Sequence, residues 1–195
     1  AGVFLASCSS TQSTTTAQTA KSSVPNYWQQ HVDYTMDVDM NVDNYQYNGK
    51  QKLVYTNNSP ETLDRVYYHL FFNAFQPGSQ MDVRSRTIAD PDRRVGSRIE
   101  GLKLNEQGQL HVTNMKQDGQ SLNPMEEGTI LIVPLAKALK PGQSTTFELD
   151  FNGQVPVQIR RSGRNNAEGV ALSMTQWFPK MAEFDRDGWN ATPYI

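Results

Sequence analysis

Apolar and polar residues alternate without a break over residues 31–43. Side chains two positions apart lie on the same face of a β-strand, so this pattern predicts one long strand with one buried face and one solvated face. The polar set includes four aspartates, Asp33, Asp37, Asp39 and Asp43. The apolar set is Val32, Tyr34, Met36, Val38, Met40 and Val42.

The next segments also favour strands over helices. Tyr47-Asn48-Gly49 has the composition of a turn, and residues 50–56 form a second predicted strand that ends at the Asn/Pro-rich residues 57–60. Residues 65–73 are apolar on both faces, which is typical of a central strand covered on both sides.

The remainder of the chain continues this pattern after one interruption. Residues 76–97 contain two prolines and several arginines, and we expect a long irregular insertion with one short helical turn. No long stretch has helical periodicity, so the predicted class is all-β, with mostly antiparallel strands at the spacing of a β-sandwich. Further strands are predicted at residues 98–104, 109–113, 129–134, 145–151 and 169–178.

The N-terminal residues have a different character. Residues 1–7 are apolar and small and begin without Met, as in the tail of a signal peptide. Leu5-Ala6-Ser7-Cys8 resembles the lipobox of bacterial lipoproteins, which implies that Cys8 carries a lipid. Residues 8–26 are rich in Ser and Thr and are predicted to be a flexible tether. The alternative is that Cys8 is an ordinary small residue in a cytosolic N-terminus.

Composition and charge exclude several classes of function. The 195 residues carry 18 basic and 20 acidic side chains, a net charge of −2, which removes the general electrostatic argument for nucleic-acid binding. A single Cys permits neither an internal disulfide nor a cysteine-type zinc site.

Metal-ligating and nucleophilic patterns are weak. His31, His69 and His111 lie in three separate predicted strands and form no metal-binding spacing, so packing or surface roles account for them better. The aspartates of residues 31–43 are better explained by a solvated strand face than by a calcium site. We find no G-x-S-x-G elbow and no phosphate-binding motif.

Arginines and late aromatic residues are the remaining candidates. The arginines near residues 84–98 have Asp82, Asp90, Asp92 and Glu100 close in sequence, which favours ion pairs that order the loops over an anion-binding patch. The late aromatic residues fit either a sugar or peptide groove or a buried seam against a further domain, and the residues alone leave both open. These residues are Trp177, Phe178, Phe184, Trp189 and Tyr194.

Four stretches resemble a known family. They are residues 70–79 (LFFNAFQPGS), residues 154–164 (Gln-Val-Pro followed by Arg-Arg-Ser-Gly-Arg), residues 176–180 (QWFPK) and residues 187–195 (Asp-Gly-Trp to Pro-Tyr-Ile). Together they look like the N-terminal region of bacterial zinc aminopeptidases of the aminopeptidase N family, the gluzincin metallopeptidases, in a lipoprotein-type subgroup. The resemblance covers residues 27–195.

This resemblance implies a saddle-like, mostly antiparallel β domain that precedes a zinc-binding catalytic domain. The H-E-x-x-H motif of that domain does not occur in the sequence, so catalytic residues and the zinc are expected beyond Ile195, with no metal bound by this segment. The family's β domain walls the active-site cleft and holds the substrate's amino group near a Thr-Gln-x-Glu/Gln stretch. Thr175-Gln176 fits its start, but Phe178 replaces the final Glu or Gln. Gln176 or Glu183 is therefore the expected substrate-binding residue; alternatively, Gln176 is a strand-end residue bonded to backbone.

The expected organisation is a signal-peptide remnant at residues 1–7, a lipidated Cys8 with its tether through residue 26, and a β domain at 27–195 that continues past Ile195. The parent protein would be a metallopeptidase anchored by lipid to a membrane of the bacterial cell envelope. Its partners would be peptide substrates and its own catalytic domain. The alternatives are a stand-alone surface-anchored β-sandwich that binds glycan or protein, and a catalytically inactive family member that serves as a scaffold.

Overall fold

The computed structural model describes residues 27–88 and 93–195. The signal-peptide remnant, Cys8 and the tether, together with Asp90 and Asp92, lie outside these ranges. Within them, no helix has the length and apolar character needed to cross a membrane.

Two antiparallel sheets make up most of the fold, which confirms the all-β class. The larger sheet has the order β1 (His31–Asn41), β2 (Gln46–Thr56), β8 (Ser144–Gln154), β4 (Gln109–Gln117) and β5 (Gln120–Ser121). The smaller sheet has the order β11 (Lys180–Met181), β3 (Leu63–His69), β7 (Ile130–Leu139) and β6 (Met125–Glu127). Two-residue strands form two further pairs, β9 (Gly163–Arg164) with β10 (Leu172–Ser173) and β12 (Phe184–Asp185) with β13 (Gly188–Trp189).

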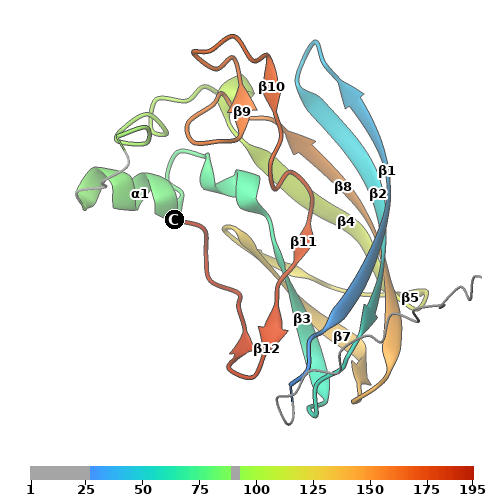
Figure 1. Ribbon diagram of the computed structural model, residues 1–195. Helices are drawn as coiled ribbons and strands as arrows, with labels where there is room; N and C mark the ends of the chain where they lie inside the picture. Colours follow the sequence, from blue (N-terminus) through green and yellow to red (C-terminus); the bar gives the residue numbers. More distant parts are fainter. Residues whose placement is uncertain (1–26, 89–92) are drawn as a thin grey trace, which may run out of the picture.

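The core lies between the inner faces of the two sheets. Leu53 and Phe147 from the larger sheet and Val66 and Tyr68 from the smaller one are all fully buried in one apolar cluster. Tyr68 contacts Phe147 edge to face across the interface, with 6.4 Å between ring centroids. The long strands curve strongly as they cross the molecule (Figure 1), in keeping with the expected saddle-like shape.

The alternating segment is the strand β1, as predicted, but it is the last strand of its sheet among the described residues. Its apolar face is only partly covered: Tyr34, Met36 and Met40 are half-buried, whereas Val32 and Val38 are each 37% exposed. An edge position explains the difference, because only one neighbouring strand lies beside it.

The turn predicted at residues 47–49 is wrong, because these residues lie inside β2. The chain turns at residues 42–45 instead, where the Asn41 side chain accepts hydrogen bonds from the backbone N–H groups of Asp43 and Asn44. Gly49 serves a packing role. A Cβ at this position would lie 2.2 Å from the ring of Phe151, its cross-strand partner.

The same arrangement, with the glycine and the aromatic residue exchanged, occurs two pairs further along the same two strands. Gly153 faces Tyr47 in the register, and a Cβ on Gly153 would lie 2.2 Å from the Tyr47 ring. Each glycine thus leaves room for the aromatic ring opposite it, and Tyr47 and Phe151 contact edge to face with centroids 6.3 Å apart. The glycine signal in the sequence reports close packing inside a sheet.

Other boundaries differ from the predicted ones. The apolar residues 65–73 divide into β3 and the 3-10 helix η1 (Phe71–Ala74). The region predicted to be irregular contains the helix α1 (Gln80–Thr87). Ser79 caps this helix, because its side chain accepts a hydrogen bond from the Asp82 N–H. Residues 98–104 do not form a strand: they are turns that lead into η2 (Leu104–Glu106). Here Val95 and Ile99, four positions apart, are the buried residues, a spacing that matches helical turns.

The predicted strand at residues 169–178 is also wrong for most of its length. Only Leu172 and Ser173 pair as β10, and the chain then runs without regular structure to β11. Residues 175–181, which we call the strap, include β11 and reach from the end of β10 to β3 (Figure 1).

Candidate functional site

A small cleft of about 10 Å³, with room for about one water molecule, joins all four stretches that carry the family resemblance. Its walls come from η1 and the residue after it, from the loop before β9, from the first residues of the strap, and from the C-terminal segment. These segments are up to about a hundred residues apart in the sequence, and the fold brings them to one place. The lining residues are Phe71, Phe72, Phe75, Arg160, Arg161, Ser162, Thr175, Gln176 and Tyr194.

Aromatic rings build one side of the cleft. Tyr194 contacts Phe71 and Phe75 edge to face, at 5.4 and 6.3 Å between centroids. The guanidinium of Arg160 lies over the Tyr194 ring, 5.5 Å from its centroid, a geometry of cation–π attraction. The C-terminal segment is held to the β6–β7 turn as well, because the Tyr194 N–H donates to Thr129 Oγ1 at 2.8 Å.

Gln176 lines this cleft in an uncommon backbone conformation. Its φ is +57°, in the left-handed region that side chains other than glycine seldom adopt. Gln176 lies between β10 and β11, not at a strand end, and its side-chain amide makes no hydrogen bond within the described residues. The strand-end role considered from the sequence is therefore not the one observed.

Both neighbours of Gln176 are anchored to other segments. The Thr175 N–H donates to Oγ of the buried Ser162 at 3.1 Å, and Ser162 Oγ also lies 3.1 Å from the Thr175 carbonyl. On the other side, the hydroxyl of Tyr47 donates to the carbonyl of Trp177 at 2.6 Å. Sequence reasoning missed Ser162 and Tyr47, because nothing in the pattern of β2 separates an anchoring tyrosine from an ordinary core residue.

Glu183, the other expected substrate-binding residue, lies away from these walls. It is exposed between β11 and β12, where its carbonyl accepts the Asn190 N–H at 2.8 Å. The charge of its carboxylate instead affects the pKa of His69. Burial lowers the pKa of the His69 imidazole, with Lys180 adding to the decrease, while the contact with the Asn190 carbonyl and the charge of Glu183 oppose it. Of the two expected substrate-binding residues, Gln176 lines the cleft and Glu183 does not.

The three histidines have separate environments. His31 lies 3.0 Å from Asp33, His111 lies 3.1 Å from Glu126, and the ring of His69 stacks on Phe71 at 4.8 Å. Across residues 27–88 and 93–195, no group of three or more His, Cys, Asp or Glu side chains is placed to hold a metal ion.

The ion pairs expected in the arginine-rich region are present in part. Arg86 binds Asp82 at 3.0 Å and lies 3.5 Å from Glu100, and Asp82 is fully buried. Arg164 has a different role: it lies over the Tyr45 ring at 4.3 Å and donates to the carbonyl of Asn105. The pairs expected with Asp90 and Asp92 fall outside the described residues.

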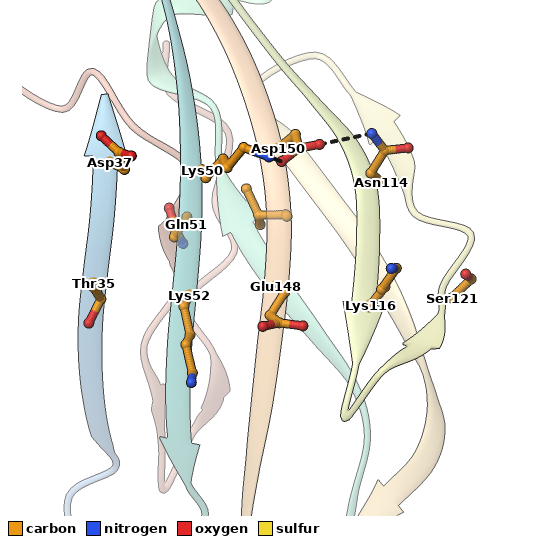
Figure 2. Close-up of a pocket in the computed structure, with 11 residues that line it drawn as sticks. Thr35, Asp37, Lys50, Gln51, Lys52, Asn114, Lys116, Ser121, Glu148 and Asp150 are labelled. Atoms are coloured by element: carbon orange, nitrogen blue, oxygen red, sulfur yellow. Dashed lines mark hydrogen bonds and ion pairs between the residues drawn. The ribbon is translucent and has the colours of Figure 1, made fainter. Parts of the chain in front are cut away.

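A second, wider hollow of about 510 Å³ lies on the polar face of the larger sheet (Figure 2). Its charges alternate across the strands, since the register places Lys50 between Asp37 and Asp150 and Glu148 between Lys52 and Lys116. Lys50 lies 3.8 Å from Asp150, which also accepts from Asn114 at 2.9 Å. Exposed pairs of this kind contribute little free energy. The hollow has as many acidic as basic side chains and is the solvated face predicted for β1.

The late aromatic residues mostly pack inward. Trp177 is half-buried and contacts Tyr47 and Phe151 at 5.8 and 6.1 Å between centroids. Trp189 stacks on Tyr55 at 6.3 Å and contacts Phe184 at 5.1 Å. Of the set, Tyr194 lines the cleft. The other four residues of the set belong to the apolar core or pack against it.

Comparison with protein-family models gives no match, and comparison with curated proteins gives none either. Among solved structures, the chain is similar to an M1 zinc metallopeptidase from Deinococcus radiodurans, with 15% identity and a TM-score of 0.44 over 71% of this chain and 24% of that one. It is also similar to a variant of a two-domain M1 zinc metallopeptidase bound to L-tryptophan, with 16% identity and a TM-score of 0.45 over 76% and 27% of the two chains. The chain therefore spans about a quarter of the length of these structures.

Proposed function

We propose that residues 27–195 are the β-rich N-terminal domain of a zinc aminopeptidase and form one wall of its active-site cleft. The observation that carries this proposal is the convergence of the four family-like stretches on one cleft. These stretches are separated in the sequence. A shared site gives a physical reason why all of them match the pattern of the same family.

The cleft has room for a group about as large as a water molecule, and its side chains fit recognition of the ammonium group of a peptide N-terminus. The amide oxygen of Gln176 can accept hydrogen bonds from an ammonium group, and the amide has no competing partner among the described residues. The rings of Phe71 and Tyr194 supply an apolar surface beside it. Gln176 is thus the proposed substrate-binding residue. Glu183 is the weaker candidate, because it does not line the cleft.

Zinc would be bound by a catalytic domain beyond Ile195. Among the described residues, no group of three or more His, Cys, Asp or Glu side chains is placed to hold a metal ion, which supports this proposal. When bound in such a domain, zinc supplies a Lewis acid and an activated water for peptide hydrolysis. The proposed part of this chain is to hold the substrate's amino end in place.

We also propose that Cys8 is lipidated and anchors the protein to a membrane of the bacterial cell envelope. The support is the lipobox-like sequence Leu5-Ala6-Ser7-Cys8 and the Ser/Thr-rich residues after it. The rival function, a stand-alone glycan- or protein-binding β-sandwich, expects Trp177, Trp189 and Tyr194 to be exposed in a groove. Tyr194 lines the cleft, but Trp177 and Trp189 pack against the core, which gives the rival less support.

The decisive experiment compares this 195-residue chain with the longer gene product in an assay with an aminoacyl chromogenic substrate and zinc. We expect no turnover by the 195-residue chain and turnover by the longer protein that a zinc chelator abolishes. In the longer protein, Gln176→Ala should raise KM about tenfold or more, because a hydrogen bond to a charged group is lost. Turnover by the short chain, or chelator-insensitive activity of the long one, would contradict the proposal.

A further inference from the structure

The strap is tied to the body of the protein mainly by side-chain hydroxyl groups. Three hydroxyls from three separate elements hold its backbone: Ser162 at Thr175, Tyr47 at Trp177 and Tyr34 at Met181. The Met181 N–H donates to the Tyr34 hydroxyl at 2.8 Å. Strand pairing contributes only at the end of the strap, where β11 lies beside β3.

The two anchors nearest to Gln176 bracket it on both sides. Ser162 fixes the residue before it and Tyr47 fixes the residue after it. A non-glycine residue in the left-handed region costs about 1–3 kcal/mol, so it persists only where its surroundings enforce it. The two anchors are the hydrogen bonds that hold the backbone on either side of Gln176.

The hydroxyl of Tyr47 is well suited to this task. The side chain is 1% exposed, and its ring is wedged between Trp177, Phe151 and Phe72. Burial raises the pKa of Tyr47 far above its usual value, and burial raises the pKa of Tyr34 to about 12. Tyr47 therefore keeps its proton and stays a hydrogen-bond donor over the whole physiological range.

We propose that Tyr47 and Ser162 are positioning residues that hold Gln176 in its left-handed conformation and thereby aim its side chain into the cleft. The role assigned to Gln176 rests on the proposed function; the bracketing by the two anchors does not. Hydroxyl anchors can fix the backbone at a single residue, here Gln176. Strand pairing is not needed for this, so the rest of the strap can remain irregular.

Strands β2 and β3 offer matched controls. Tyr55, on β2 like Tyr47, and Tyr68, on β3, are fully buried, but their hydroxyls make no hydrogen bond within the described residues. Tyr→Phe removes one oxygen atom in every case. Of the variants at Tyr47, Tyr55 and Tyr68, only Tyr47→Phe removes an anchor of the strap.

Amide hydrogen exchange of the 195-residue chain, followed by NMR, tests the bracketing. In Tyr47→Phe, the amides of Thr175 and Met181 keep their acceptors Ser162 and Tyr34. They should still exchange about tenfold faster relative to the amides of the β2–β8 ladder, because loss of the Tyr47–Trp177 hydrogen bond lets the strap open locally more often. Tyr55→Phe should leave this ratio unchanged. Ser162→Ala provides the second variant if Tyr47→Phe does not fold. An equal increase in strap and ladder, or no increase, would overturn the proposal.

Kinetics of the longer gene product test the consequence for the site. Tyr47→Phe should raise KM for aminoacyl substrates severalfold with a smaller effect on kcat, as expected for a lost binding contact, while Tyr55→Phe should change neither. Should the longer protein have no aminopeptidase activity, the proposed function fails, and the exchange ratio still decides the bracketing by itself. If KM is unchanged in Tyr47→Phe although the strap exchanges faster, the positioning of Gln176 is refuted.

Discussion

The larger sheet and the C-terminal part of the chain, residues 155–195, are held together in different ways. In the sheet, β2 pairs with β1 and with β8 along its full eleven residues. In the C-terminal part, the strands are two residues long, and side chains such as Ser162 and Tyr47 hold the backbone. The first arrangement gives a rigid frame, and in the second three hydroxyls hold an irregular segment in place. The candidate cleft belongs largely to the second region.

The largest effect should come from emptying the core behind the sheet. Phe151 is 2% exposed and packs against Tyr47, Trp177 and Gly49. Phe151→Ala should lower the free energy of unfolding by about 3–5 kcal/mol, measured by urea denaturation. Met125→Ala, at a 54% exposed position, is the control and should cost less than about 0.5 kcal/mol. A loss below about 1 kcal/mol for Phe151→Ala would mean that the sheet is not the main source of stability.

A smaller and more local effect is expected in the C-terminal part. Gly163 has a φ of +142°, and a Cβ there would lie 2.4 Å from the backbone Cα of Gln158. Gly163→Ala should therefore displace the loop that carries Arg160 and Ser162, and should cost about 1–3 kcal/mol. Gly169→Ala, at φ +82° with no atom within 4 Å, isolates the cost of backbone conformation alone. Equal losses in the two variants, measured by the same denaturation, would show that the close approach has no role.

The smallest change should have the opposite sign. Gln51 of β2 is 2% exposed, and neither atom of its amide makes a hydrogen bond within the described residues. Gln51→Met keeps the length of the side chain and removes the buried polar atoms, so it should raise the free energy of unfolding by about 1 kcal/mol. Tyr47→Phe, in the same strand, should instead be destabilising by a similar amount. If Gln51→Met is destabilising, the contrast between a ladder held by backbone and a strap held by side chains is wrong.

The sequence predicted the sheet better than the strap, for a physical reason. Strand alternation reports burial on one face, and β1 and β8 have it, so their existence follows from the pattern. Gly49 was misread as a turn signal because its function depends on Phe151, about a hundred residues away. Long-range packing of this kind leaves no mark on the local pattern.

The candidate site shows the same limit. Resemblance to a family pointed to Gln176, which lines the cleft, and equally to Glu183, which does not. Local sequence could not separate them, because the path of the chain after β10 depends on hydroxyls from β1, β2 and the β9 loop. Residues 169–178 are mixed polar and aromatic, and their predicted strand failed where side-chain anchors replaced backbone pairing.

The acidic residues of β1 acquire a meaning from its place at the end of the sheet. An eleven-residue edge with half-exposed Val32 and Val38 is a template on which a second copy of the chain could add its own strand. Asp33, Asp37 and Asp39 line this edge on its solvated face. Two such edges brought together would set like charges beside each other, and that repulsion discourages self-association. The carboxylates that at first invited comparison with a calcium site thus have the position of charges that oppose edge-to-edge pairing of strands.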